Sequence, residues 1–117
     1  MMWANHDAAN IWDLRISHLE DNITWQGAVD RREFELIACR LIEKNSRDPC
    51  YYTIDGKPVF MLSDPSNLVS GLGGVEHTAD AFSWLRAQAI KTGFKRLHLQ
   101  LVNTGADNLN LSGIDIE

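Results

Sequence analysis

The sequence predicts an α/β fold in which parallel strands alternate with helices. Residues Val59–Leu62 form a continuous apolar run bounded by turn-forming residues, as is typical of a strand buried on both faces of a parallel sheet. A second, mostly apolar run spans Leu97–Val102, and residues 75–92 between the two runs show the apolar periodicity of a helix. A strand, a helix and a strand in this order predict a βαβ unit, in which the two strands run parallel.

The first of these strands is the centre of the predicted fold. Asp55-Gly56 predicts a tight turn ahead of it. Pro58 is acceptable at its first residue, where the missing N–H breaks no ladder bond. The strand ends at Asp64, and α/β folds bind their ligands at the carboxyl ends of strands. Asp64 is therefore a candidate binding residue, although an aspartate before a proline is more often an ordinary turn residue.

Upstream of this strand, the sequence predicts the end of another strand, a long loop and a helix. Residues 1–3 are apolar and are followed by polar side chains, and residues 8–30 show neither a helical nor a strand period. Asp30 is a good N-cap, and Glu33 completes a capping box. The helix that follows has an apolar stripe and ends near residue 46, ahead of Pro49. The stripe consists of Phe34, Ile37, Ala38, Leu41 and Ile42.

Downstream of the central strand, residues 65–74 contain three glycines and a proline and are predicted to form a loop. The helix over residues 75–92 ends at Gly93, which favours the left-handed conformation that terminates helices. For residues 106–117 we expect little regular structure. The predicted inner face of the helix consists of Val75, Ala79, Phe82, Leu85, Ala89 and Ile90.

Charge and composition argue against several classes of function. The net charge is −5 and no stretch concentrates lysine and arginine, so no nucleic-acid partner is expected. No apolar run approaches the roughly 18 residues of a membrane span, and the first residues lack a signal-peptide pattern. These observations do not determine where in the cell the protein is located, and the cytoplasm is the default expectation.

No metal or cofactor is expected either. Cys39 and Cys50 alone make neither a disulfide framework nor a zinc site, so we expect two free thiols. His6 and Asp7 lack a third metal ligand. The glycines of residues 71–74 lack both the dinucleotide fingerprint and the P-loop lysine.

The number of strands is too small for a closed domain. The three predicted parallel strands leave two open edges, and each helix would pack on a sheet that is too narrow for it. We therefore expect residues 1–117 to be a single segment of a larger α/β domain, truncated at both ends. Open edges of this kind also predict self-association.

Five blocks of the sequence resemble the glycoside hydrolase family 99-like domain, also known as the WbsX-type glycosyltransferase domain. They occur in the family's order over about residues 2 to 103, which correspond to the family's central portion. The resemblance implies part of a (β/α)8 TIM barrel that acts on glycans. The blocks are MWANHD at 2–7, GAVDRREFE at 27–35, RDPCYYTIDGKPVFML at 47–62, GLGGVEHTADAFSWLR at 71–86 and GFKRLHLQLV at 93–102.

The resemblance also suggests where a glycan would bind. An aromatic ring can stack on a sugar, and Asn, His and Asp side chains can hold its hydroxyls. The predicted substrate-binding residues are Trp3, Asn5, His6, Asp7, Asp64 and Asn103. The other interpretation of the first four is a polar strand end with Trp3 in the core.

Two further tryptophans, Trp12 and Trp25, lie in the predicted long loop. They either line a sugar cleft or cover the apolar rim of the barrel, and we slightly favour the rim.

The family's catalytic carboxylates lie in a late block resembling Asn-Glu-Trp, which this sequence lacks. No catalytic residue is assigned, and enzymatic activity is left open. Asp7 and Asp64 could in principle form the pair of carboxylates that hydrolyses a glycosidic bond. The distance between the two groups decides this, and the sequence does not give that distance. The predicted function is a part of a carbohydrate-active protein, which hydrolyses or transfers glycans and contributes a sugar-binding cleft. The alternative is a non-catalytic remnant or interaction module.

Overall fold

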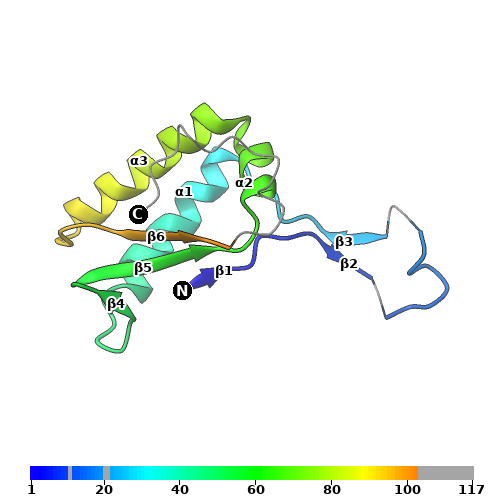
Figure 1. The fold of residues 1–117 in the computed structure, drawn as a ribbon, viewed down its shortest axis with the longest axis horizontal. Coiled ribbons are helices and arrows are strands. Elements are labelled where there is room, and N and C mark those ends of the chain that lie inside the picture. Colours follow the sequence, from blue (N-terminus) through cyan, green and yellow to red (C-terminus); the bar gives the residue numbers. More distant parts are fainter. Residues whose placement is uncertain (11, 20–21, 103–117) are drawn as a thin grey trace.

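The computed structural model describes residues 1–10, 12–19 and 22–102. They form a body in which helices pack on a small sheet, and a narrow two-stranded arm that extends away from it (Figure 1). The mixed α/β class is confirmed, and so are the parallel strands. Asn103 and the tail from 106 to 117 lie outside the described residues, so the predictions made for them are not addressed.

The body's sheet is built around β5 (Lys57–Leu62). On one edge β5 pairs in parallel with β6 (His98–Leu101), and its last two residues pair in parallel with β1 (Met2–Trp3). The expected βαβ unit is therefore present. The parallel strands follow the order β1, β5, β6, which is also their order in the chain.

A short strand that the sequence analysis missed, β4 (Thr53–Ile54), forms a hairpin with the start of β5. Its two-residue turn is Asp55-Gly56, as predicted, and both residues have positive φ angles, 51° and 74°. The hairpin turns back so tightly because glycine and aspartate tolerate this conformation. β4 and β1 lie end to end along the same edge of β5, because alternate N–H groups of β5 donate to Tyr52 O and to Met1 O.

The first predicted helix is confirmed as α1 (Arg31–Arg40), and the side chain of Asp30 accepts a hydrogen bond from the N–H of Glu33. Its last turn continues as a π-helix, η1 (Leu41–Asn45). The second predicted helix is α3 (Val75–Lys91), followed by Gly93 with φ of 103°.

The prediction of a loop over residues 65–74 is wrong, because most of it is a helix, α2 (Pro65–Leu72). Asp64 is its N-cap and accepts a hydrogen bond from the N–H of Asn67 at 3.0 Å. Pro65 occupies the first turn, where its missing N–H costs nothing, and Gly73 ends the helix with φ of 90°. All the start and stop signals of a helix are thus present within ten residues.

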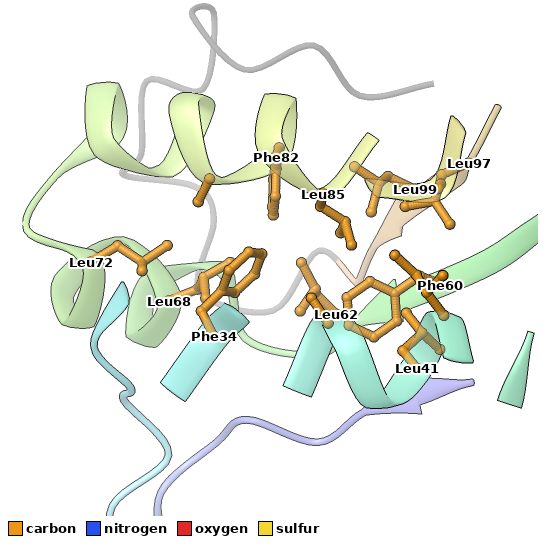
Figure 2. Packing of buried hydrophobic residues seen from close by; sticks show 14 residues of the cluster. Phe34, Leu41, Phe60, Leu62, Leu68, Leu72, Phe82, Leu85, Leu97 and Leu99 are labelled. Carbon is orange, nitrogen blue, oxygen red and sulfur yellow. The ribbon is translucent and has the colours of Figure 1, made fainter. Parts of the chain in front are cut away.

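Alternate residues of β5 and β6 face the helices. Phe60 and Leu62 of β5, and Leu99 of β6, pack in one cluster with α1 and α3, so both helices cover the same face of the sheet (Figures 1 and 2). His98 and Gln100 alternate with these leucines and therefore lie on the opposite face, where their side chains are 3.2 Å apart. Figure 2 shows the cluster between the helices and the sheet; its largest labelled members are Phe34, Phe60 and Phe82.

The predicted inner face of α3 needs one correction. Phe82, Leu85 and Ala89 are buried, but Ile90 is exposed. Thr78 and Ala81 are buried in its place, since the packed stripe of α3 is rotated toward these smaller residues, which let the helix lie close to the core.

The prediction of an irregular loop over residues 8–30 also needs correction. Two short antiparallel strands, β2 (Ala8–Ala9) and β3 (Ile23–Trp25), form the arm seen in Figure 1. A register shift between Ala8 and Ala9 interrupts the pairing. Such short and irregular strands carry no recognisable period in the sequence.

Cys39 and Cys50 are free thiols, as expected. Within the described residues, none of the helices has the length and apolarity required to traverse a membrane. The same residues contain no cluster of three metal-ligating side chains.

Candidate functional site

The candidate site lies where β1 and β5 end. Because the two strands are parallel and Trp3 pairs with Leu62, their carboxyl ends lie side by side. The polypeptide leaves β1 toward the arm and leaves β5 toward α2, so the segments after both strands lie next to each other. Of the six residues predicted from the sequence, the structure describes five, and it brings Asn5, Asp7 and Asp64 into one hydrogen-bonded group.

Asn5 is the buried centre of this group, with only 1% of its surface exposed. Its Oδ1 accepts a hydrogen bond from the N–H of Asp64 at 2.9 Å, and its Nδ2 donates to the carbonyl of Asp64. The Ser63 hydroxyl lies 3.5 Å from the same Oδ1. Both polar groups of the Asn5 amide are therefore occupied within the protein. Its role in the structure is to join two strand ends, and its burial separates it from the surface at which a sugar would bind.

Asn67, in the first turn of α2, extends the group toward the arm. Its Nδ2 donates to the carbonyl of Asn5 at 3.1 Å and to Oδ1 of Asp7 at 3.0 Å. The sequence does not single out Asn67, because residues 65–74 are predicted to form a loop. The signal was available: Asn67 stands three residues after an aspartate N-cap, so its N–H is bound to Asp64 and its side chain starts from a fixed position.

Asp7 is the exposed member of the group. Its Oδ1 accepts hydrogen bonds from the N–H of Gly27 at 2.8 Å and from Asn67. Both of these bonds are made to the same carboxylate oxygen. The carboxylate is thus held in place through one oxygen while the side chain stays at the surface. His6 beside it is exposed as well.

Gly27 allows this close approach of the arm to the strand end. A Cβ at this position would collide with the backbone carbonyl of Asn5. The missing side chain lets the segment after β3 lie directly on the segment after β1, which places the N–H of Gly27 at Asp7. Glycine is the residue for such backbone contacts.

Trp3 does not present its ring to a ligand. The indole lies 6.4 Å from the rings of both Phe34 and Phe60, measured between centroids, and is stacked on the latter at 15°. Trp3 is partly buried against the core. Within the described residues Trp3 packs against the core, as in the second interpretation, because β1 turns it toward the helices on the same face as Leu62.

Asp64 also has a structural role, since its Oδ1 caps α2. Asn103 lies outside the described residues. Of the six predicted residues, His6 and Asp7 remain as exposed side chains at the strand ends.

The arm contributes an aromatic side chain at the same place. Trp25 pairs with Ala8, the residue next to Asp7, and 74% of its surface is exposed. Trp12 is 89% exposed and lies in the segment that connects β2 and β3. Both side chains are exposed in the described residues, which do not include a closed barrel, so the rim interpretation of Trp12 and Trp25 stays a prediction.

A separate depression of about 410 Å³ lies near the opposite end of β5, where the Tyr51 hydroxyl donates to Val59 O at 2.6 Å. It is lined by Lys44, Asn45, Asp48, Cys50 and Tyr51. Oδ1 of Asp48 is bound to the N–H of Cys50. This hollow is removed from His6 and Asp7 and does not form part of the candidate site.

Compared with protein-family models, with curated proteins and with solved structures, the chain gives no match. The similarity to the glycoside hydrolase family 99-like domain therefore stays a prediction.

Proposed function

We propose that this chain is a segment of a carbohydrate-active protein of the (β/α)8 type and that His6 and Asp7 belong to its glycan-binding site. The order of the strands supports the proposal. The parallel strands β1, β5 and β6 are neighbours in the sheet in the same order in which they occur in the chain. The helices α1 and α3 both cover one face of this sheet. Successive βα units in a barrel have this arrangement, and barrels bind substrates at the carboxyl ends of their strands.

The single observation that carries the proposal is the state of Asp7. Its carboxylate is oriented by the N–H of Gly27 and by Asn67, yet it stays exposed at a strand's carboxyl end. A fixed acceptor of this kind can bind a sugar hydroxyl without losing side-chain entropy on binding. The exposed imidazole of His6 adds a second polar group.

Affinity electrophoresis tests this function. The protein is run through native gels that contain dextran, mannan or xylan, and its mobility is compared with that in a gel without polysaccharide. We expect at least one polysaccharide to retard the protein and Asp7→Asn to reduce the retardation. Asp13→Asn is the matched control, because Asp13 is paired with Arg15 in the arm and lies outside the hydrogen-bonded group. Unchanged mobility of the wild-type protein in all gels would contradict the proposal.

Hydrolysis and transfer need a separate measurement. The polysaccharide that retards the protein is incubated with it, and new reducing ends are counted. Since the sequence lacks the family's late carboxylate block, we expect binding without release of reducing ends.

A second candidate function, an interaction module without turnover, is favoured by residues 12–19, which lie between β2 and β3 in the chain. Trp12 and Leu14 of this segment are 89% and 85% exposed. Large apolar side chains at the surface can serve as contacts for another protein. Self-association could also use the outer edge of β6, which pairs only with β5 among the described residues. Sedimentation velocity over a hundredfold range of concentration tests this: a constant monomer would contradict self-association.

A further inference from the structure

We propose that Trp25 is the aromatic platform of the glycan site, and that the site takes a neutral sugar chain in preference to an acidic one. This inference rests on the proposed glycan function and deepens it. It assigns to Trp25 the stacking role that the sequence suggested for Trp3.

The backbone of the arm ties Trp25 to Asp7 at two points. Trp25 pairs with Ala8, which is the next residue after Asp7. Two residues beyond Trp25, the N–H of Gly27 donates to the Asp7 carboxylate at 2.8 Å. Trp25 and Ala8 thus face each other in one short antiparallel pair, in which facing Cα atoms are about 4.5–5.5 Å apart, and Asp7 is the residue that precedes this pair.

The surroundings of Trp25 leave its ring uncovered. The residue opposite is alanine, whose single methyl group cannot shield an indole, and 74% of the tryptophan surface is exposed. A tryptophan buries about 150–250 Å² when it is covered. The ring of Trp3, the other tryptophan suggested for stacking, already packs on Phe60 and Phe34.

The chemistry of the two side chains defines the ligand. The face of an indole accepts an apolar surface, and the C–H face of a sugar ring is one. At the edge of that ring, hydroxyl groups can donate to the Asp7 carboxylate, which has acceptors only, and His6 can serve as a further partner. One flat apolar face bordered by hydroxyl donors describes a pyranose in a glycan chain.

The charge of the site distinguishes neutral from acidic sugars. Asp7 is a carboxylate at the surface, and the whole chain has a net charge of −5. A uronic acid or a sulfated sugar would bring a second negative charge to this position, where like charges repel. A neutral chain carries no such penalty.

Trp12 provides an internal control. It is also a tryptophan on the arm and is even more exposed, at 89%. No described contact joins it to Asp7; its neighbour Asp13 is instead bound to Arg15 and Asn10. Substitution of either tryptophan removes the same exposed ring, so the two variants differ only in position.

The experiment uses the same gels, with dextran, mannan and xylan as the neutral probes. The polysaccharide that binds is also carboxymethylated, which adds negative charge to the same backbone. We expect Trp25→Ala to weaken the association at least tenfold, Trp12→Ala to change it less than twofold, and carboxymethylation to weaken it at least fivefold for the wild-type protein. Thermal melting of both variants establishes that they are folded, and Trp25→Phe should retain part of the binding.

Failure of this inference can be told apart from failure of the proposed function. If no probe retards the wild-type protein, both are overturned. If the wild-type protein binds and Asp7→Asn weakens binding while Trp25→Ala does not, the glycan site stands and the platform is refuted. Equal losses in Trp12→Ala and Trp25→Ala would also refute the platform, and tighter binding of the carboxymethylated polymer would refute the preference for neutral chains.

Discussion

Asn5 and Asp64, 59 residues apart in the chain, join the ends of two parallel strands through a pair of hydrogen bonds. The Asn5 side chain accepts a hydrogen bond from the N–H of Asp64 at 2.9 Å and donates one to the carbonyl of Asp64. These two bonds connect the strand ends just beyond the last paired residues. Asp64 in turn caps α2, and α2 positions Asn67 against Asp7. The buried amide thereby determines where the exposed carboxylate lies.

The first prediction concerns this amide. Asn5→Ala leaves the N–H and the carbonyl of Asp64 without their partner in a place where Asn5 is 1% exposed. A buried polar group left unsatisfied costs about 1–3 kcal/mol, and we expect a loss in this range in the free energy of unfolding by urea. His6→Ala, at the exposed neighbour, should change it by no more than about 0.5 kcal/mol. Equal stability of the two variants would mean that the hydrogen bonds between Asn5 and Asp64 do not stabilise the fold.

The second prediction concerns the contact between the arm and β1. Gly27→Ala places a methyl group against the carbonyl of Asn5, which is backbone and cannot rotate away. We expect a loss of about 1–3 kcal/mol, the usual cost of inserting atoms into a packed site, and a shifted fluorescence maximum of the arm tryptophans. Gln26→Ala, at an exposed neighbour, is the control. If Gly27→Ala melts with the wild-type protein and has the same fluorescence, the backbones are farther apart than the structure shows.

The third prediction separates capping by Asp64 from ligand binding. Asp64→Ala removes the acceptor for the N–H of Asn67, and lost N-caps cost about 0.5–2 kcal/mol. Asp64→Asn keeps an acceptor oxygen, so its stability should stay close to that of the wild-type protein. We also expect its glycan binding to be unchanged. If Asp64→Asn lost as much glycan binding as Asp7→Asn, Asp64 would have to be counted among the ligand-binding residues.

The fourth prediction concerns pH. Burial raises the pKa of the Tyr51 phenol, so the folded state holds this proton more tightly than the unfolded state. The associated stability is complete below the ordinary tyrosine pKa of about 10 and is lost as the pH rises through the higher pKa of the folded state. Tyr51→Phe should therefore lose less stability than the wild-type protein between about pH 9 and 11.5.

Urea unfolding at a series of pH values measures this difference. Tyr52→Phe, at an exposed tyrosine of the same segment, should follow the wild-type curve. Parallel curves for wild type and Tyr51→Phe would show that the Tyr51 phenol is not the group responsible. At neutral pH, Tyr51→Phe should cost about 1 kcal/mol, the typical contribution of one hydrogen bond, here the bond to Val59 O.

The parts of the fold that could be predicted are those with a strong local signal. The stripe of α1 and the Asp30 cap were sufficient to locate that helix, and the apolar run before Ser63 was sufficient to locate β5. The misses have different causes. α2 was obscured by its glycines, although Asp64, Pro65 and Gly73 are ordinary helix boundary signals. β4 was missed because two residues give no period, although Asp55-Gly56 between apolar runs is a hairpin signal.

The candidate site was predictable in location but not in the roles of its residues. The sequence predicts that Asn5, Asp7 and Asp64 lie at the carboxyl ends of two strands, and the structure brings the three residues together. Whether a polar side chain there binds the protein or a ligand depends on tertiary contacts, and the buried Asn5 side chain is hydrogen-bonded to Asp64. The face on which Trp3 lies depends on its register with Leu62, which the sequence does not display. The pairing of Trp25 with Ala8 depends on an arm whose strands are too short to recognise.

The most direct test of the glycan site is a ¹H–¹⁵N NMR spectrum recorded while an oligosaccharide cut from the bound polysaccharide is added. The chain has four tryptophans, and their indole N–H signals report on four places at once. Trp3 and Trp84 pack against the core cluster, Trp12 lies between β2 and β3 in the chain, and Trp25 pairs with Ala8, the residue after Asp7. We predict that the Trp25 indole and the backbone N–H of Gly27 shift together while the Trp12 indole stays in place. Shifts confined to residues remote from Asp7, or no shift at saturating oligosaccharide, would contradict the account.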